Sequence, residues 1–125
     1  MWSPRWSPDG RYLAALAGES AATRLMVFNF TRRGWEELAS GTNLSWPSWS
    51  RDSAFVYAAD GDSLVRIAIA DHKKEQIASL KGVRTTAYYL DRWNIGWFGV
   101  APDGQPITTR DTGIEEIYAF DLEYK

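Results

Sequence analysis

Apolar residues along this chain come in short runs that are rich in aromatic and β-branched residues and are separated by Gly, Asp, Ser and Asn. Runs of this length and make-up predict β-strands joined by turns. The stretch from Leu25 to Phe28 is apolar at consecutive positions, which indicates a strand covered on both faces, as in sheets stacked face to face. No segment has the period of an amphipathic helix. The pattern therefore predicts an all-β fold.

A short segment with a turn at its centre occurs three times. Trp6 to Gly10 returns as Trp49 to Ser53 and again as Val100 to Gly104. The aspartates of the three copies are separated by roughly 40–50 residues, which is the period of a four-stranded propeller blade. The repeat therefore predicts three similar structural units.

Each unit offers the same series of strands. One strand precedes the turn and a second follows it, where Tyr12, Phe55 and Pro106 take matching positions. A third strand is expected near 24–30, 64–70 and 116–122, and a fourth near 35–39 and 75–79. We expect four-stranded antiparallel units, although the third unit has no residues left for its outer strand unless part of 83–89 supplies it.

The residues of the turn explain why it recurs. In the first copy a proline precedes Asp9, whose carboxylate can accept hydrogen bonds from nearby backbone amides, and Gly10 can adopt the left-handed conformation. Asp103 and Gly104 repeat this arrangement. The middle copy keeps only Asp52 and is expected to be the weakest turn of the three.

The Trp-Ser-Pro-Asp-Gly turn after a Pro-x-Trp strand resembles the repeat of TolB-type β-propellers, the WD40-like PD40 repeat. The stretch from Ala101 to Leu122 is similar to the last blade of propellers attached to regulators and kinases of soil bacteria. The resemblance covers nearly the whole chain. It implies a six-bladed ring that binds proteins or small ligands, and it does not imply catalysis by the ring.

Three blades amount to half of such a ring. We expect a single half-propeller domain over 1–125, with blade 1 at about 1–44, blade 2 at about 45–82, a linker at about 83–94 and blade 3 at about 95–125. An open arc would expose apolar blade faces, so we expect a homodimer that completes a six-bladed ring. Other closed or swapped assemblies, a lone arc and a fragment of a longer propeller are the alternatives.

Composition excludes several kinds of site. The chain has no cysteine and one histidine, which excludes disulfides, thiolate zinc sites, a cysteine nucleophile and a multi-histidine metal site within one chain. With 14 basic against 16 acidic residues the net charge is −2, so we expect no nucleic-acid partner. We expect no cofactor and no metal. No apolar run suggests a signal peptide or a membrane span, so the default expectation is a cytoplasmic protein without a membrane partner.

The best candidates for partner or ligand binding lie between the second and third units. Loops that enter the first strand of a blade face one end of a propeller's channel, and Tyr, Trp and Arg are common at binding hot spots. The candidates are Arg84, Tyr88, Tyr89, Arg92 and Trp93. The alternative role of these residues is to cover the dimer joint or to plug the channel. Trp6, Trp49 and Trp97 are expected to pack between blades.

Other polar groups favour structural roles. His72 is expected in a solvated turn, and 60–63 in a hairpin turn rather than a calcium loop. The adjacent Glu36 and Glu37 point to opposite faces of a strand and cannot act as an acid–base pair. We therefore expect a non-catalytic binding or scaffold module, with an enzyme site in the channel of the assembled ring as the alternative.

Overall fold

The computed structural model describes residues 1–19, 22–79, 98–101 and 103–108, and the regular secondary structure in these ranges is β-strand. The all-β prediction is confirmed. The strands are β1 (Trp2–Trp6), β2 (Tyr12–Glu19), β3 (Ala22–Asn29), β4 (Gly34–Gly41), β5 (Leu44–Trp49), β6 (Phe55–Asp60), β7 (Ser63–Ala68), β8 (Lys74–Ser79), β9 (Phe98–Val100) and β10 (Pro106–Thr108).

Strands that follow each other in the sequence pair with each other. The first sheet has the order β1-β2-β3-β4 and the second has β5-β6-β7-β8, while β9 and β10 form a two-stranded sheet. All these pairs are antiparallel. The two four-stranded units agree with the sequence repeat. The strand predicted near 116–122 and the linker at about 83–94 lie outside the described residues.

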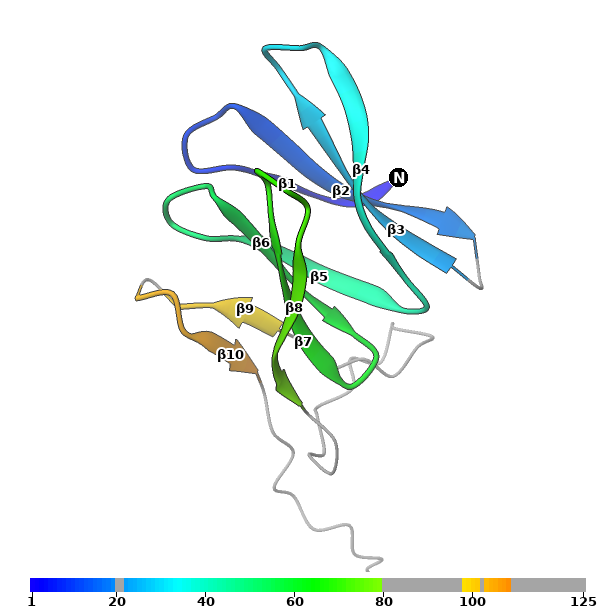
Figure 1. Cartoon of the computed structure of the whole chain (residues 1–125), viewed down its shortest axis with the longest axis vertical. Helices are drawn as coiled ribbons and strands as arrows, with labels where there is room; N and C mark the ends of the chain where they lie inside the picture. The colour runs from blue at the N-terminus through cyan, green and yellow to red at the C-terminus, as the bar shows by residue number, and fades with distance from the viewer. Residues whose placement is uncertain (20–21, 80–97, 102, 109–125) are drawn as a thin grey trace, which may run out of the picture.

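The three sheets follow one another in space in the order of the chain (Figure 1). The first strand of the second sheet, β5, contacts β1, β2 and β3 of the first sheet. In the same way β9 contacts β5 and β6. Each unit therefore packs through its first strand on the unit before it, as blades of a propeller do.

The two complete sheets repeat fine backbone detail. The ladder between β1 and β2 is irregular at Ser3, which has a φ of 52°, and the ladder between β5 and β6 is irregular at Trp46, with a φ of 54°. In the turns between the third and fourth strands, Arg33 and His72 have φ values of 55° and 59°. Residues other than glycine rarely adopt this conformation, so its recurrence indicates a shared geometry.

The turn between β6 and β7 is a tight hairpin in which Asp60 pairs with Ser63 across the turn. Asp60 accepts a hydrogen bond from Lys74 Nζ at 2.7 Å, and Lys74 Nζ also lies 3.4 Å from the carbonyl oxygen of Ser40 in the first sheet. The carboxylate that could have suggested a calcium loop therefore forms an ion pair with the neighbouring outer strand. His72 lies exposed in its turn.

The main core lies between the two four-stranded sheets. Residues from β2 and β3 meet residues from β6 and β7, and each is at most 4% exposed. Burial of such aliphatic groups is the main favourable contribution to folding. The core comprises Ala14, Leu16, Leu25, Val27, Leu38, Leu44, Val56, Ala58, Val65 and Ile67.

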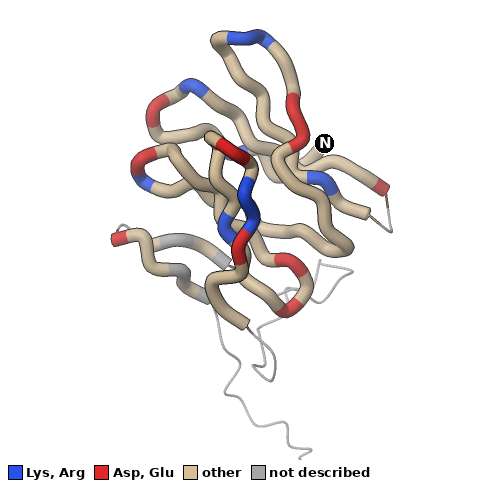
Figure 2. Tube along the Cα trace, in the orientation of Figure 1, with Lys and Arg blue, Asp and Glu red and all other residues tan. Residues whose placement is uncertain are grey.

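A smaller cluster covers the opposite face of the second sheet. It contains Tyr57, Ala59 and Leu64, with Trp46 and Phe55 packed against it among others. The charged residues lie mainly in turns and on outer strands, away from the stacked inner strands (Figure 2). In the described part of the chain, no helix is long and apolar enough to cross a membrane.

Candidate functional site

The first repeat turn is built around a buried serine. The N–H of Ser7 donates to the Tyr12 carbonyl at 2.9 Å, and Ser7 Oγ accepts the N–H of Tyr12 at 3.0 Å. The same hydroxyl donates to Asp9 Oδ1 at 2.7 Å, and this oxygen also accepts the N–H of Arg11 at 3.0 Å. The N–H of Gly10, which has a φ of 74°, donates to the Ser7 carbonyl. Asp9 and Gly10 are therefore engaged within the turn.

The middle turn has the same arrangement. Ser50 Oγ accepts the N–H of Phe55 at 3.0 Å and donates to Asp52 Oδ1 at 2.6 Å. Ser53 takes the place of the glycine, with a φ of 60°. Its Oγ accepts the N–H of Asp9 at 3.2 Å, so a side chain of the middle turn bonds the backbone of the first turn. The turn expected to be the weakest thus carries an extra bond between the two sheets.

The third turn is one residue tighter. The N–H of Ala101 donates to the Gln105 carbonyl at 2.8 Å, and Asp103 Oδ1 accepts the N–H of Gln105 at 3.0 Å. Pro106 pairs with the last residue before the turn, so its alignment with Tyr12 in the sequence is wrong by one position. The reason is chemical, because Ala101 has no hydroxyl to accept a hydrogen bond and Pro106 has no N–H to donate one.

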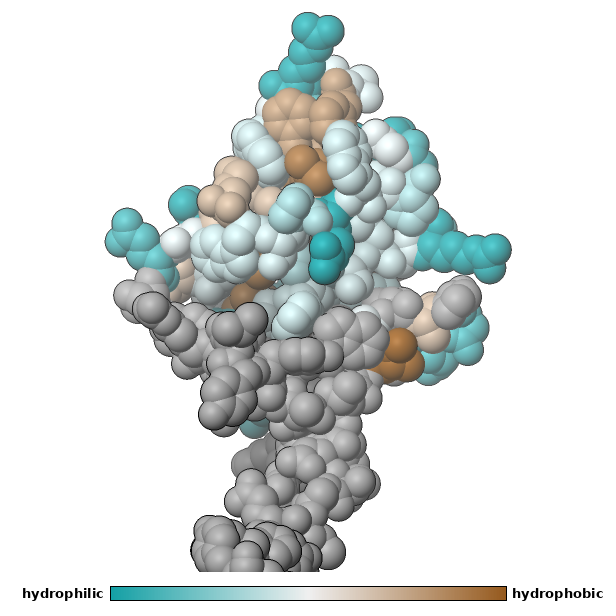
Figure 3. Space-filling model, turned by 180° about the vertical axis from the view of Figure 1, so that it is seen from behind, coloured by the Kyte–Doolittle hydropathy of each residue, from teal (hydrophilic) through white to brown (hydrophobic). Residues whose placement is uncertain are grey.

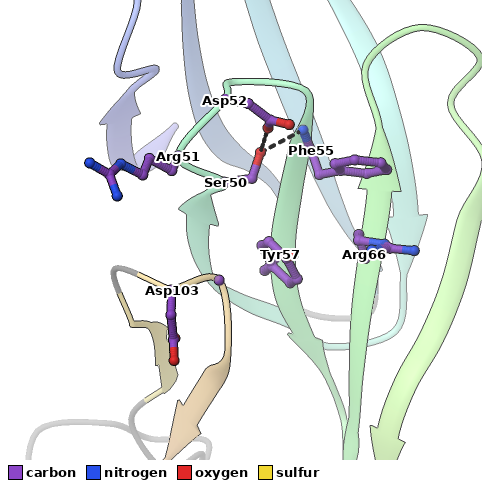
Figure 4. Close-up of a pocket in the computed structure, with 8 residues that line it drawn as sticks. Ser50, Arg51, Asp52, Phe55, Tyr57, Arg66 and Asp103 are labelled. Atoms are coloured by element: carbon purple, nitrogen blue, oxygen red, sulfur yellow. Dashed lines mark hydrogen bonds between the residues drawn. The ribbon is translucent and has the colours of Figure 1, made fainter.

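The second and third turns border a cleft of about 550 Å³ on the second sheet. Figure 4 shows the side chains around it, with Tyr57 near the centre, the Ser50–Asp52 turn above it and Asp103 on the facing turn. The cleft is lined by Ser50, Arg51, Asp52, Phe55, Tyr57, Arg66, Asp103 and Gly104.

One wall of the cleft is a stacked cation. The guanidinium carbon of Arg66 lies 4.5 Å from the centre of the Phe55 ring, and Arg66 forms an ion pair with Glu75 on β8. The hydrogen bond that Arg66 donates to Glu75 raises the pKa of Arg66, so this side chain stays charged. Its Nε is buried and has no hydrogen-bond partner among the described residues. A buried donor of this kind favours a ligand that offers an oxygen.

The aspartates of the first two turns are ionised. The N–H of Arg11, then the hydroxyl of Ser7, lower the pKa of Asp9 from 3.8 to about 2. The hydroxyl of Ser50 lowers the pKa of Asp52, and the N–H of Ala54 adds to this effect. Carboxylates held in this form accept hydrogen bonds and do not supply protons near neutral pH.

The residue types around the cleft suit binding. Its aspartates accept hydrogen bonds within their own turns, and Glu75 balances the positive charge of Arg66. The aromatic rings of Phe55 and Tyr57 add apolar surface. Among the described residues, no group of three or more His, Cys, Asp or Glu side chains could hold a metal ion.

The structure describes only some of the residues singled out in the sequence. Trp49 lies in the joint between the first two sheets, with its Nε1 donating to the Arg5 carbonyl at 2.8 Å and its ring stacked on Tyr12. Trp6, at the equivalent position, is 62% exposed. The candidate recognition residues and one packing candidate lie outside the described residues; they are Arg84, Tyr88, Tyr89, Arg92, Trp93 and Trp97.

Sequence reasoning missed the wall formed by Phe55, Tyr57 and Arg66. A signal was present, because Arg66 occupies the position at which the first unit has Val27: Tyr57 pairs with Arg66 just as Ala14 pairs with Val27. An arginine at an apolar position of the repeat marks a place where the blade face differs from a packed core.

The model of a protein family matches most of the chain. Residues 2–107 match the family described as the β-propeller domain of lipoprotein LpqB. No curated protein shows a significant match to the chain.

Two solved propellers have a similar fold. The chain is 19% identical to TolB from Acinetobacter baumannii, with a TM-score of 0.63 over 90% of this chain and 27% of that chain. It is 15% identical to the β-propeller domain of the Trilobed protease from Pyrococcus furiosus, which has an open velcro topology, with a TM-score of 0.52 over 62% of this chain and 29% of that chain. The chain thus spans less than a third of either structure, and the likeness concerns the fold alone.

Proposed function

The chain belongs to the family of LpqB lipoprotein β-propeller domains, and from that membership we propose that it is a non-catalytic binding and scaffold module, two copies of which complete one six-bladed ring. The ligand is a peptide or a small molecule that enters the cleft between the second and third turns. It offers a carbonyl or carboxylate oxygen to Arg66 Nε and an apolar group to the rings of Phe55 and Tyr57.

The observation that carries the binding role is the Arg66–Phe55 stack with its buried Nε donor. Because Glu75 already pairs with one end of the guanidinium, the buried Nε–H can donate to a neutral carbonyl as readily as to a carboxylate. The structural use of Asp52 and Asp103 supports the absence of catalysis, since neither is placed as a free acid or base. Arginine and tyrosine are both enriched at binding hot spots.

Selection of peptides from a displayed random library on the immobilised chain tests the binding role. Peptides that bind the wild type should lose at least about 10-fold in affinity on Arg66→Leu, which removes the donor and keeps an apolar side chain. They should bind unchanged to Arg24→Leu, which removes an exposed cation from β3 of the first sheet. Equal binding to wild type and Arg66→Leu would refute this site.

The ring is tested separately by the mass of the chain in solution. Light scattering on a sizing column should give twice the chain mass of 14.2 kDa over a range of concentrations. A folded protein that keeps the mass of one chain at every concentration would refute the ring, and would leave the binding role of the cleft to the peptide experiment.

A further inference from the structure

The joint between the first two sheets shows how one unit docks on another. Trp49, the last residue of β5, stacks on Tyr12 with ring centres 5.8 Å apart, and its Nε1 donates to the Arg5 carbonyl at 2.8 Å. Beside it, Val56 and Ile67 of the second sheet are fully buried against the first. One tryptophan and a strip of aliphatic side chains thus form the docking face of the second unit.

The first sheet carries the same face, and no other described sheet covers it. Trp6 is the last residue of β1 and pairs with Leu13, as Trp49 pairs with Val56. Whereas Val56 is fully buried, Leu13 is only half-buried, and Trp6 is 62% exposed. In the second unit these positions are packed against the first sheet, whereas the equivalent positions of the first unit lie at a surface.

This surface is more aromatic than its equivalent in the second sheet. Trp6 stacks on Phe30 with ring centres 4.9 Å apart, Phe30 meets Phe28 edge to face, and Phe28 meets Trp35 in the same way. Phe30 and Trp35 are 40% and 42% exposed. Seen from behind, apolar side chains gather over the end of the molecule that the first sheet occupies (Figure 3). We call Trp6, Phe28, Phe30 and Trp35 the aromatic face.

We propose that the aromatic face is the docking surface for a second copy of this chain, whose third unit stacks on it as the first sheet stacks on the second. The proposal rests on the proposed ring and names the surface that would form its joint. Exposed clusters of large apolar residues mark interaction sites, and Trp and Phe residues that become buried supply much of the binding energy.

The stacking order within the chain favours a second copy as the occupant. The first sheet receives the second on the side opposite to the aromatic face, and the second sheet receives β9 in the same sense. In the joint between the first two sheets, the second unit packs the face that carries the last residue of its first strand on the opposite face of the unit before it. A unit packed on the aromatic face would form a further joint of the same kind. A contact of this kind between identical chains is head-to-tail, and it closes into a ring when the rotation per unit allows it.

The test compares three proteins over a range of concentrations by light scattering and sedimentation. The wild-type chain should be a dimer, and Trp6→Asp should raise its dissociation constant at least about 100-fold by placing a charge in the joint. Lys73→Asp places the same side chain in the exposed turn before β8, and should dimerise as the wild type does. Circular dichroism checks that each variant is folded.

A second measurement on the wild type covers the case in which Trp6→Asp does not fold. In oxidative footprinting above and below the dimer dissociation constant, Trp6 and Phe30 should be protected only in the dimer. A dimer that leaves these two rings as reactive as in the monomer would overturn the aromatic face and leave the ring itself standing, because the joint would lie elsewhere. A wild type that stays monomeric would overturn both.

Discussion

At the scale of single residues, the repeat is a set of hydrogen bonds around one turn. The hydroxyl of a buried serine accepts a backbone N–H and donates to the aspartate, and the aspartate accepts the N–H of the residue two positions later. The position after the aspartate needs a left-handed backbone, which Gly10 adopts freely and Ser53 adopts at a cost. Ser53 gains in return a hydrogen bond to the neighbouring turn.

Gly10→Ala should lower the free energy of unfolding by about 1 kcal/mol, because an L side chain is disfavoured at a φ of 74°. A Cβ built at Gly10 meets nothing within 4 Å, so the cost arises from the backbone alone. Gly34→Ala is the matched control, since its Cβ also meets open space and its φ is not left-handed. Urea unfolding measures both, and equal midpoints for the two variants would contradict this account.

Acid should unfold the chain partly through its turns. The pKa of Asp9 is about 2 in the folded chain, compared with 3.8 for an unperturbed aspartate, and folding lowers the pKa of Asp52 too. A carboxyl with a lowered folded pKa stabilises the fold above its unfolded pKa, and this contribution is lost as pH falls through the folded pKa. We therefore expect the urea midpoint to fall between about pH 4 and pH 2, and Asp9→Asn to flatten that decrease. Glu19→Gln, at the exposed end of β2, should leave the slope unchanged.

At the scale of strands and sheets, one tryptophan joins the first two units. Trp49 comes from the first strand of the second sheet and reaches both a backbone carbonyl and a ring of the first sheet. Its place in the joint follows from the repeat, which brings the strand before the turn against the preceding unit.

Trp49→Asp should abolish cooperative unfolding, because it places a charge between two packed sheets. Trp49→Phe keeps the apolar contact and loses the hydrogen bond to the Arg5 carbonyl, so it should cost about 1 kcal/mol. Thermal unfolding followed by circular dichroism separates the two. A well-folded Trp49→Asp monomer would show that the joint does not depend on this side chain.

Strand positions could be predicted because each strand is a local pattern bounded by turn residues. The strands expected near 24–30 and 64–70 are β3 and β7, and those near 35–39 and 75–79 fall within β4 and β8. The tightened third turn could not be predicted from alignment, since the Asp-Gly pair is intact and the change lies in what Ala101 and Pro106 cannot bond. The Arg66 cleft depends on which blade faces meet, and its one signal in the sequence is the arginine at a position where the first unit has Val27.

At the scale of the whole molecule, the two four-stranded sheets share one core. Leu25 and Val27 of the first sheet belong to the same buried cluster as Val56 and Ile67 of the second. Each sheet needs the other to shield these side chains from water, so we expect neither sheet to be stably folded on its own.

Amide hydrogen exchange should therefore report one unfolding unit. The slowest amides of β2 and β3 should open with free energies within about 1 kcal/mol of those of β6 and β7. Amides of the exposed turns provide the fast-exchanging reference. A difference above about 2 kcal/mol between the two sheets would show that one of them opens independently.

The tightened third turn has a consequence for how such repeats change over time. In the first two turns the serine hydroxyl accepts the N–H five residues later, so losing either group alone leaves its partner without this hydrogen bond. Ala101 and Pro106 lack both groups together. The two positions are thus epistatic, because each replacement is tolerated when the other is present. A score that treats each aligned position separately would count two unfavourable substitutions where the turn has undergone one compensated change.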